Sequence, residues 1–180
     1  MPIRQRLTST VRIVVTVGLC ALTALGCAIV ATPASADTIY YRTMWANSSW
    51  MNLAVRDGST AEGADIIQWW SDNNADQQWA IYTYPADPVN VYRLLNKGSG
   101  LCLTTDGVAG DPVRQRVCDP VNGSHQEWLF TWVWYYGGST LYNPVSGLML
   151  DVQGDSYWGG AEIDTWYPNG QVNQVFGFSV

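Results

Sequence analysis

The chain carries three copies of one short pattern, and this repetition restricts the available folds more than any other feature. Each copy has a leucine, a branched aliphatic residue, and a glutamine followed two positions later by an aromatic residue. The copies are Leu53, Ile66, Gln77 and Trp79; Leu103, Val113, Gln126 and Trp128; and Leu150, Ile163, Gln174 and Phe176. A unit this short cannot bury its own apolar face, so the three copies must share one core.

The spacing of the copies and the runs between them predict an all-β fold. The glutamines lie 49 and 48 positions apart, and the first and third copies have the same internal spacing. The middle copy has a shorter first loop and a longer second one. Alternating runs at 92–95, 101–104, 113–117 and 128–130 have strand periodicity, with turn residues between them. We expect a closed all-β body of threefold pseudo-symmetry, with repeats at about 38–86, 87–134 and 135–180.

Residues 1–36 have the features of a secretory signal peptide. Arg4, Arg6 and Arg12 give a basic start, residues 13–30 are apolar, and 34–36 read Ala-Ser-Ala. Small residues at these positions favour cleavage after Ala36. A retained membrane anchor and a lipid anchor at Cys27 are the alternatives. We expect a secreted single domain, 37–180, with no membrane association after cleavage.

The charge of the predicted mature chain excludes some classes of partner. Without the three arginines of the signal segment, the chain has 6 basic and 15 acidic residues, a net charge of about −9. Such a surface repels nucleic acid and anionic membranes, and suits neutral or weakly charged partners. All 10 tryptophans lie after residue 36, more than one core needs. The surplus indicates another use for aromatic rings. The sequence does not fix the oligomeric state.

Two cysteines, Cys102 and Cys118, remain after the signal is removed. Their spacing within one repeat of an exported chain favours a disulfide. Closing a loop of this size is worth about 3 kcal/mol in the chain-entropy model. The alternatives are a reactive thiol pair or metal ligands, but two cysteines and one histidine, His125, make a poor zinc set. We expect no metal and no cofactor.

The chain resembles the ricin B-type lectin family over the whole predicted mature segment. The resemblance rests on residues of all three copies: Leu150-Asp151-Val152, Trp166, Asn173-Gln174-x-Phe176, Gln77-Gln78-Trp79 and Gln126-Glu127-Trp128. It implies a β-trefoil, with sugar binding as the default activity. The resemblance also implies that the cysteine pair is a structural disulfide.

The third copy retains the full set of residues that the resemblance implies for sugar binding. Asp151 would accept hydrogen bonds from two hydroxyls, and Asn173 would donate and accept. Trp166 would stack on the C–H face of a sugar, and Asp164 would add a polar contact. The same copy supplies two further groups, Gln174 as a brace and Tyr157 with Trp158 as an extra wall. The alternative roles are structural: turn chemistry for the aspartate and asparagine, core packing for the tryptophan, and loop bonding for the glutamine.

The other two copies depart from this set. In the first, Ala54 replaces the aspartate, while Trp69, Asp76 and Gln77 remain and predict a weak second site. Losing the main acceptor costs about 1–3 kcal/mol at a buried contact. In the middle copy the three site positions hold Thr104, Arg116 and His125. We expect the middle copy to be structural.

A non-enzymatic lectin for galactose-type or xylan-type glycans is the function that these residues favour. A glycosidase is one alternative, with Asp151 paired with Asp164 or Asp155 as acid and base. The other is a protein-interaction trefoil, such as a protease inhibitor, acting through the loop at 82–91. The fold alone does not decide among them.

Overall fold

The computed structural model describes residues 39–83, 91–120 and 123–179. The predicted signal segment at 1–36 and most of the loop proposed for protein interaction lie outside the described residues. Tyr40–Val180 forms one compact unit. In the described part of the chain, no helix is long and apolar enough to cross a membrane.

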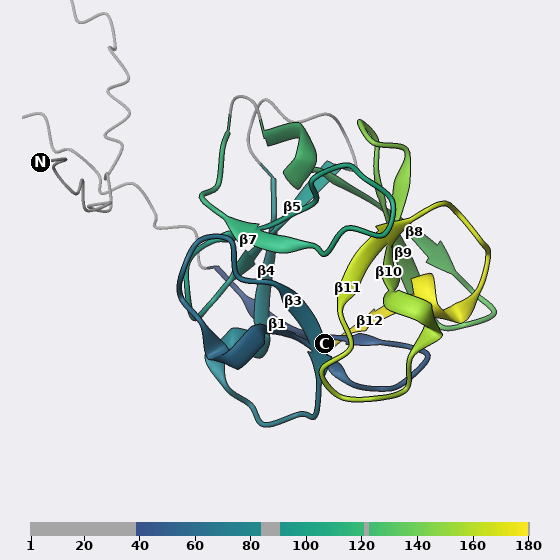
Figure 1. Cartoon of the computed structure of the whole chain (residues 1–180), viewed down its shortest axis with the longest axis horizontal. Helices are drawn as coiled ribbons and strands as arrows, with labels where there is room; N and C mark the ends of the chain where they lie inside the picture. Colours follow the sequence, from purple (N-terminus) through teal and green to yellow (C-terminus); the bar gives the residue numbers. More distant parts are fainter. Residues whose placement is uncertain (1–38, 84–90, 121–122, 180) are drawn as a thin grey trace, which may run out of the picture. The chain divides into compact units, whose positions relative to one another are not determined.

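Each predicted repeat contributes four strands to this unit (Figure 1). The first repeat has β1 (Tyr41–Ala46), β2 (Asn52–Val55), β3 (Ile66–Trp69) and β4 (Gln78–Tyr82). The second has β5 (Val91–Asn96), β6 (Cys102–Thr104), β7 (Arg114–Arg116) and β8 (Trp128–Val133). The third has β9 (Gly138–Asn143), β10 (Leu148–Val152), β11 (Ile163–Trp166) and β12 (Phe176–Phe178). A 3-10 turn precedes the last strand of each repeat: η2 (Ala75–Gln77), η3 (Gly123–Gln126) and η5 (Val172–Gln174).

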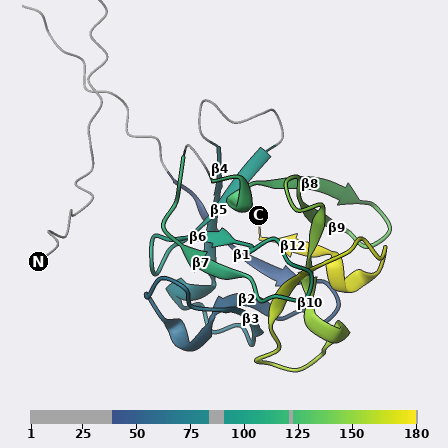
Figure 2. The same ribbon diagram turned by 45° about the horizontal axis from the view of Figure 1, so that its top comes forward.

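Six of the strands close into a barrel. Antiparallel pairing runs from β1 to β4, β5, β8, β9 and β12, and then back to β1. Closure removes the free edges that would otherwise pair with other chains. The remaining strands form the hairpins β2–β3, β6–β7 and β10–β11. The second strand of each hairpin, β3, β7 or β11, lies near the centre of the view in Figure 1. Figure 2 shows the same fold from a tilted angle. The predicted β-trefoil of three repeats is confirmed.

The repeated aliphatic residues meet where the three hairpins converge. The backbone N–H of Ile66 donates to the carbonyl of Val113, and the N–H of Val113 donates to the carbonyl of Ile163, both at 2.8 Å. All three side chains are fully buried, together with the three repeated leucines. The three copies therefore share one core, as the repeat predicts.

The aromatic residue of each Gln-x-aromatic motif fills this core. Trp79, Trp128 and Phe176 are all buried. The indole Nε1 of Trp79 donates to the carbonyl of Leu53 at 3.0 Å, and that of Trp128 donates to Leu103 at 3.3 Å. The motif thus ties the last strand of a repeat to its own hairpin.

The three hairpins have the same register, which makes positions in different repeats comparable. At one level of each hairpin, the directly opposed pairs are Asn52 with Trp69, Cys102 with Arg116, and Met149 with Trp166. Two residues further along the first strand, the opposed pairs are Ala54 with Ile67, Thr104 with Arg114, and Asp151 with Asp164. Alternate residues of a strand face the same side, so both levels face the same side of their hairpin. The predicted equivalence of the three sets of site positions therefore has a structural basis.

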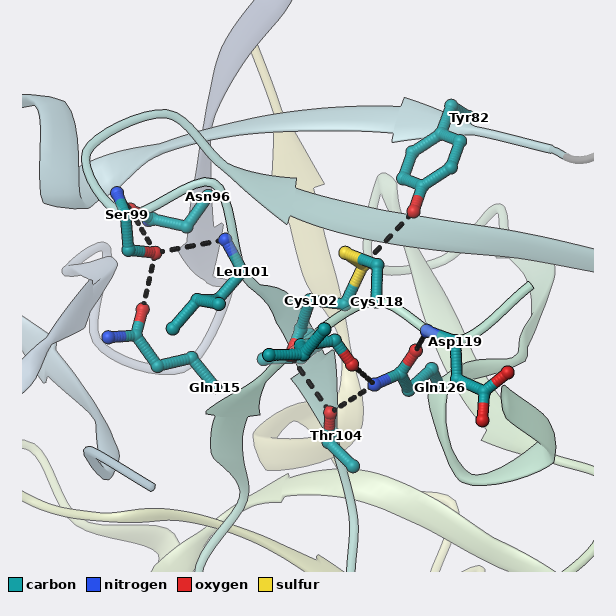
Figure 3. The surroundings of a disulfide bond; sticks show 12 residues. Tyr82, Asn96, Ser99, Leu101, Cys102, Thr104, Gln115, Cys118, Asp119 and Gln126 are labelled. Carbon is teal, nitrogen blue, oxygen red and sulfur yellow. Dashed lines mark hydrogen bonds between the residues drawn. A yellow bond between two sulfur atoms is a disulfide. The ribbon is translucent and has the colours of Figure 1, made fainter. Parts of the chain in front are cut away.

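The predicted disulfide between Cys102 and Cys118 is present (Figure 3). It joins β6 to the loop after β7, and the hydroxyl of Tyr82 lies 3.0 Å from the Cys102 sulfur. Beside it, the Gln126 amide donates to the hydroxyl of Thr104 at 3.1 Å and to the carbonyl of Val117 at 2.9 Å. The disulfide and these bonds hold the middle hairpin against the loop that follows it.

Candidate carbohydrate-binding site

A pocket of about 440 Å³ opens beside the β10–β11 hairpin of the third repeat. Its lining combines carboxylates, amides and one indole ring: Asp151, Asp155, Asp164, Gln153, Asn169, Gln171, Asn173 and Trp166, with Gly110 and Gly154. Apart from Gly110, every one of these residues comes from the third repeat. The pocket brings together four of the five residues predicted for this site.

Asp151 and Asn173 form a fixed pair at the pocket wall. The Asn173 Nδ2 lies 3.0 Å from Oδ1 and 2.9 Å from Oδ2 of Asp151, so the amide donates to both carboxylate oxygens. Both side chains are buried. The Asn173 Oδ1 accepts from the Asn169 side chain at 3.3 Å. This network fixes the orientation of the carboxylate and leaves it lone pairs for further donors.

Trp166 supplies an apolar surface at the same pocket. It stands at the end of β11 and is 45% exposed, which excludes the alternative that it is a core residue. Gly110 of the middle repeat supports the ring from the side. A Cβ at that glycine would lie 3.2 Å from Cζ3 of the indole, and its φ of +86° disfavours other residues. The third-repeat platform therefore depends on a loop of another repeat.

Asp164 is the least compensated group in the pocket. It lies directly opposite Asp151 across the hairpin, and each of the two residues is only 3% exposed. Its Oδ2 accepts a long 3.5 Å hydrogen bond from the Gln153 amide, while its Oδ1 has no partner among the described residues. Two like charges directly opposed in a sheet are destabilising, and a buried carboxylate oxygen without a donor adds to that cost.

These surroundings favour the neutral forms of both acids. Burial, and after it the neighbouring Asp151 carboxylate, raise the pKa of Asp164 from its ordinary value of 3.8 to about 7. Burial is also the main cause that raises the pKa of Asp151 from 3.8 to about 6, against the hydrogen bonds of the Gln174 and Asn173 side chains. Near neutral pH the pair therefore resists carrying two full charges.

Gln174 lies behind the pocket and braces a loop. Its Nε2 donates to the carbonyl of Tyr167 at 2.9 Å, and its Oε1 accepts from the backbone N–H of Asn169 at 3.0 Å. Gln77 has the same arrangement in the first repeat, with bonds to the carbonyl of Trp70 and the N–H of Asp72. Both glutamines hold the strand-end loop in place and do not line the pockets.

A smaller pocket of about 270 Å³ lies at the equivalent place in the first repeat. Trp69, 42% exposed, and Asp76 line it, while Ala54 and Ile67 take the places of the two buried acids. Burial is the main cause that raises the pKa of Asp76. The pocket keeps the ring and three aspartates, Asp57, Asp72 and Asp76, none of them buried, but it has no acid at the position of Asp151.

The middle repeat uses the equivalent positions for internal bonds. Arg116, in place of the platform tryptophan, bonds Asp106 at 2.8 Å, and Arg114 bonds the same carboxylate at 2.7 Å. The hydroxyl of Thr104 donates to the carbonyl of Cys102. His125 packs so closely on Gly107 that a Cβ at that glycine would lie 2.7 Å from its ring. These contacts agree with the structural role predicted for this repeat.

Two features of the aromatic residues differ from the sequence interpretation. Tyr157 and Trp158 do not line the third-repeat pocket. The carbonyl of Trp158 instead accepts from the Gln68 amide at 2.9 Å, and the following glycines pack against Trp69 of the first repeat. The β8–β9 hairpin, which the sequence interpretation did not single out, exposes Trp132, Trp134 and Tyr135. No charged residue occurs from 128 to 150, and this uncharged stretch is the sequence feature that could have indicated the exposed aromatic hairpin.

Comparison with known proteins agrees with the fold and the repeats. Two solved structures with similar coverage of this chain are the designed threefold-symmetric protein ThreeFoil and 1,3Gal43A, an exo-β-1,3-galactanase from Clostridium thermocellum. ThreeFoil is 27% identical with a TM-score of 0.71, over 78% of this chain and 98% of its own. The galactanase is 25% identical with a TM-score of 0.72, over 80% of this chain and 30% of its own.

A third structure, the C-terminal half of the earthworm R-type lectin in complex with GalNAc, shares the fold. It is 20% identical with a TM-score of 0.60, over 77% of this chain and 97% of its own. No curated protein matches the sequence. Two overlapping stretches, 30–116 and 75–166, match the family described as ricin-type beta-trefoil lectin domain-like. Because these stretches together span well over half of its length, the chain belongs to the ricin-type β-trefoil lectin-like family.

Proposed function

We propose that this chain is an exported lectin whose third repeat binds one residue of a galactose-type or xylan-type glycan. One observation carries the proposal: Asp151, Asn173 and the half-exposed Trp166 line the same pocket. Family membership and the lectin fold support a carbohydrate-binding role. The basic start, apolar core and small-residue end of 1–36 support export of a domain at 37–180.

Each of the three residues matches one part of a pyranose. The Asp151 carboxylate accepts hydrogen bonds from two neighbouring hydroxyls, which are stronger than bonds between neutral groups. The Asn173 amide holds that carboxylate and offers further polar contacts. The indole of Trp166 covers the C–H face of the ring. A sugar whose hydroxyl points away leaves these buried groups unpaired, and this is the source of selectivity.

Trp69 and Asp76 of the first repeat form a second, weaker site in this proposal. They offer a stacking ring and a half-buried acceptor, while Gln77 supports the loop behind them. Two unequal sites on one molecule would strengthen the capture of a polymer through multivalency. A polysaccharide is therefore expected to bind more tightly than its monosaccharide.

Binding without turnover is the role that this pocket favours. A glycosidase would use the Asp151 and Asp164 carboxyl groups on opposite sides of a scissile bond. Here the two side chains lie side by side on neighbouring strands of one hairpin, and the Asn173 amide bonds both oxygens of Asp151. That arrangement suits an acceptor for hydroxyls better than a nucleophile. A reducing-sugar assay on galactan and xylan checks this point.

The test is a titration of the purified, oxidised protein followed by NMR of the indole N–H groups. Galactose comes first, because one similar structure is that of a galactanase. Lactose, xylo-oligosaccharides and glucose follow. The site variants are Trp166→Ala and Asp151→Ala. The control is Trp132→Ala, which removes a comparably exposed indole that does not line the pocket.

Saturable binding to one sugar class is expected, with affinity reduced at least tenfold in both site variants and unchanged in the control. Binding that persists in both site variants and disappears in Trp69→Ala would move the main site to the first repeat. A folded protein that responds to none of these sugars would refute the proposal. Release of reducing sugar that stops in Asp151→Asn would replace the lectin by a glycosidase.

A further inference from the structure

The third-repeat pocket contains two buried carboxylates and lacks a counter-charge of its own. Within the described residues, neither Asp151 nor Asp164 forms an ion pair. The nearby arginine Arg56 pairs with Glu162 at 3.1 Å and with Asp65 at 3.7 Å. Buried charges in proteins are normally paired or neutralised. Without a partner, protons neutralise this pair, and a cation supplied from outside can take their place.

Apart from Arg56, which Glu162 and Asp65 already pair, the charged groups of the described residues that act on the pair are also acidic. Asp155, on the turn after β10, acts on Asp151, and Glu162, just before β11, acts on Asp164. From the middle repeat, the backbone of Pro112 bridges to that of Asp164, and among the described residues only Gly110 of that repeat lines the pocket. The middle-repeat arginines Arg114 and Arg116 are occupied by Asp106 and Asp65, outside the pocket lining. The field at the pocket is therefore negative.

We infer that the third-repeat pocket selects a protonated amino sugar, whose ammonium group pairs with Asp151 and Asp164. This inference rests on the proposed function and names the ligand class of the same site. An ammonium has three donors and no acceptor, which matches two carboxylates with free lone pairs. The Gln153 amide, which in the described part of the chain makes one side-chain bond of 3.5 Å, is the group that the ammonium displaces to reach Asp164.

The rest of the pocket requires that this cation be part of a sugar. Trp166 offers a ring for a C–H face, and the Asn173 amide offers contacts for hydroxyl groups. A simple amine has neither feature and would use only the carboxylates. An N-acetylated sugar has both features but no charge, and its acyl group must also be accommodated beside two acids. A hexosamine with a free amine satisfies all the groups together.

The first repeat provides an internal comparison. Ala54 and Ile67 stand where the third repeat has its two buried acids, and the aspartates that line this pocket, Asp57, Asp72 and Asp76, are not buried. The first-repeat pocket therefore lacks the buried acid pair although it keeps the ring. Preference for an amino sugar is expected at the third repeat alone.

The experiment compares three ligands that share one ring: galactosamine, N-acetylgalactosamine and galactose. The glucose series gives the same comparison for the epimer. Dissociation constants are measured at pH 7 by NMR titration of the indole N–H groups, with ethanolamine as the simple amine. The variants are Asp164→Asn and, as a control outside the pocket, Trp132→Ala. A parallel series at pH 5 neutralises the acid pair.

Galactosamine or glucosamine is expected to bind at least tenfold more tightly than the neutral sugar of its series, and more tightly than ethanolamine. In Asp164→Asn, and at pH 5 in the unchanged protein, this ratio should fall to within threefold. In Trp132→Ala it should persist. Equal affinity for amino and neutral sugars overturns the inference and leaves the proposed function intact. A ratio that survives Asp164→Asn also overturns it. Binding to xylo-oligosaccharides alone overturns the inference only, whereas a protein that binds neither these sugars nor xylo-oligosaccharides refutes both.

Discussion

Replacing Asp164 by asparagine is expected to stabilise the fold at pH 8 and to flatten the dependence of its stability on pH. In the unfolded chain this carboxyl titrates near 3.8, whereas in the fold burial and the Asp151 carboxylate raise its pKa to about 7. Between these values the folded protein binds more protons than the unfolded chain. The contribution of Asp164 to the free energy of unfolding therefore falls as the pH rises from about 4 to about 8, and is constant above both pKa values.

The size of the effect follows from the same pKa and from the position of the side chain. A pKa raised from 3.8 to about 7 corresponds to about 4 kcal/mol at a pH above both values. The pocket is open to solvent, which screens part of this electrostatic cost, so we expect about half of the 4 kcal/mol to appear in the free energy of unfolding. Asp164→Asn should then raise the free energy of unfolding by about 2 kcal/mol at pH 8 and by much less at pH 4.

Urea unfolding at pH 4, 6 and 8 measures this difference. Asp57→Asn is the control, because Asp57 is an exposed acid in the turn Arg56–Gly58 that follows β2 of the first repeat, with φ at 57°. Asparagine tolerates that backbone, so the control should change stability by less than about 0.5 kcal/mol at any pH. If Asp164→Asn instead lowers the free energy of unfolding at pH 8, the fold stabilises the ionised Asp164 carboxylate. The conclusion that this acid lacks a compensating partner would then be wrong.

Three further predictions concern the supports of the site. Gly110→Ala should weaken sugar binding at Trp166, because the new Cβ would press on the indole ring. Gly63→Ala is the control: it has the same φ of +86° but no neighbour within 4 Å, so it should lose a similar stability without losing affinity. Equal losses of affinity in sugar titrations would contradict this. Gln174→Ala should lower the free energy of unfolding by about 1–3 kcal/mol, because two hydrogen bonds between its buried side chain and the loop backbone are lost. Urea denaturation measures this loss, and a variant of full stability with abolished binding would instead make the amide a ligand contact. Reducing the disulfide should cost about 3 kcal/mol, seen as a lower melting temperature, and an unchanged value would refute it.

The sequence predicted the fold because the repeated residues are those that the fold uses three times. The leucines, the branched aliphatic residues and the motif aromatics occupy equivalent buried places, and no single copy could reveal this. Their spacing also aligned Asp151, Ala54 and Thr104 correctly, because the hairpins share one register. Such positions are set by local periodicity and by the shared core, and both are visible in a linear pattern.

Contacts between repeats were not predictable in the same way. The placement of Tyr157 and Trp158 was misjudged, because their loop packs on the first repeat and not over its own pocket. The missing counter-charge of Asp164 was also invisible, since it depends on which partners the arginines take in space. Such features depend on the packing of one repeat against another, for which the sequence has no periodic signal.

Packing between repeats also explains why the middle copy differs so much from the third and still matters to it. Its own pocket positions are occupied by the ion pairs of Asp106, yet its loop still places Gly110 against the ring of Trp166. In the same way, Gly159 and Gly160 of the third repeat pack against Trp69 of the first. Each platform is thus completed by a neighbour, so a repeat can lose its own ligand contacts without losing its part in another site. In the proposed lectin the binding unit is therefore a pair of repeats, and an isolated third repeat would lack both the shared core and one side of its pocket.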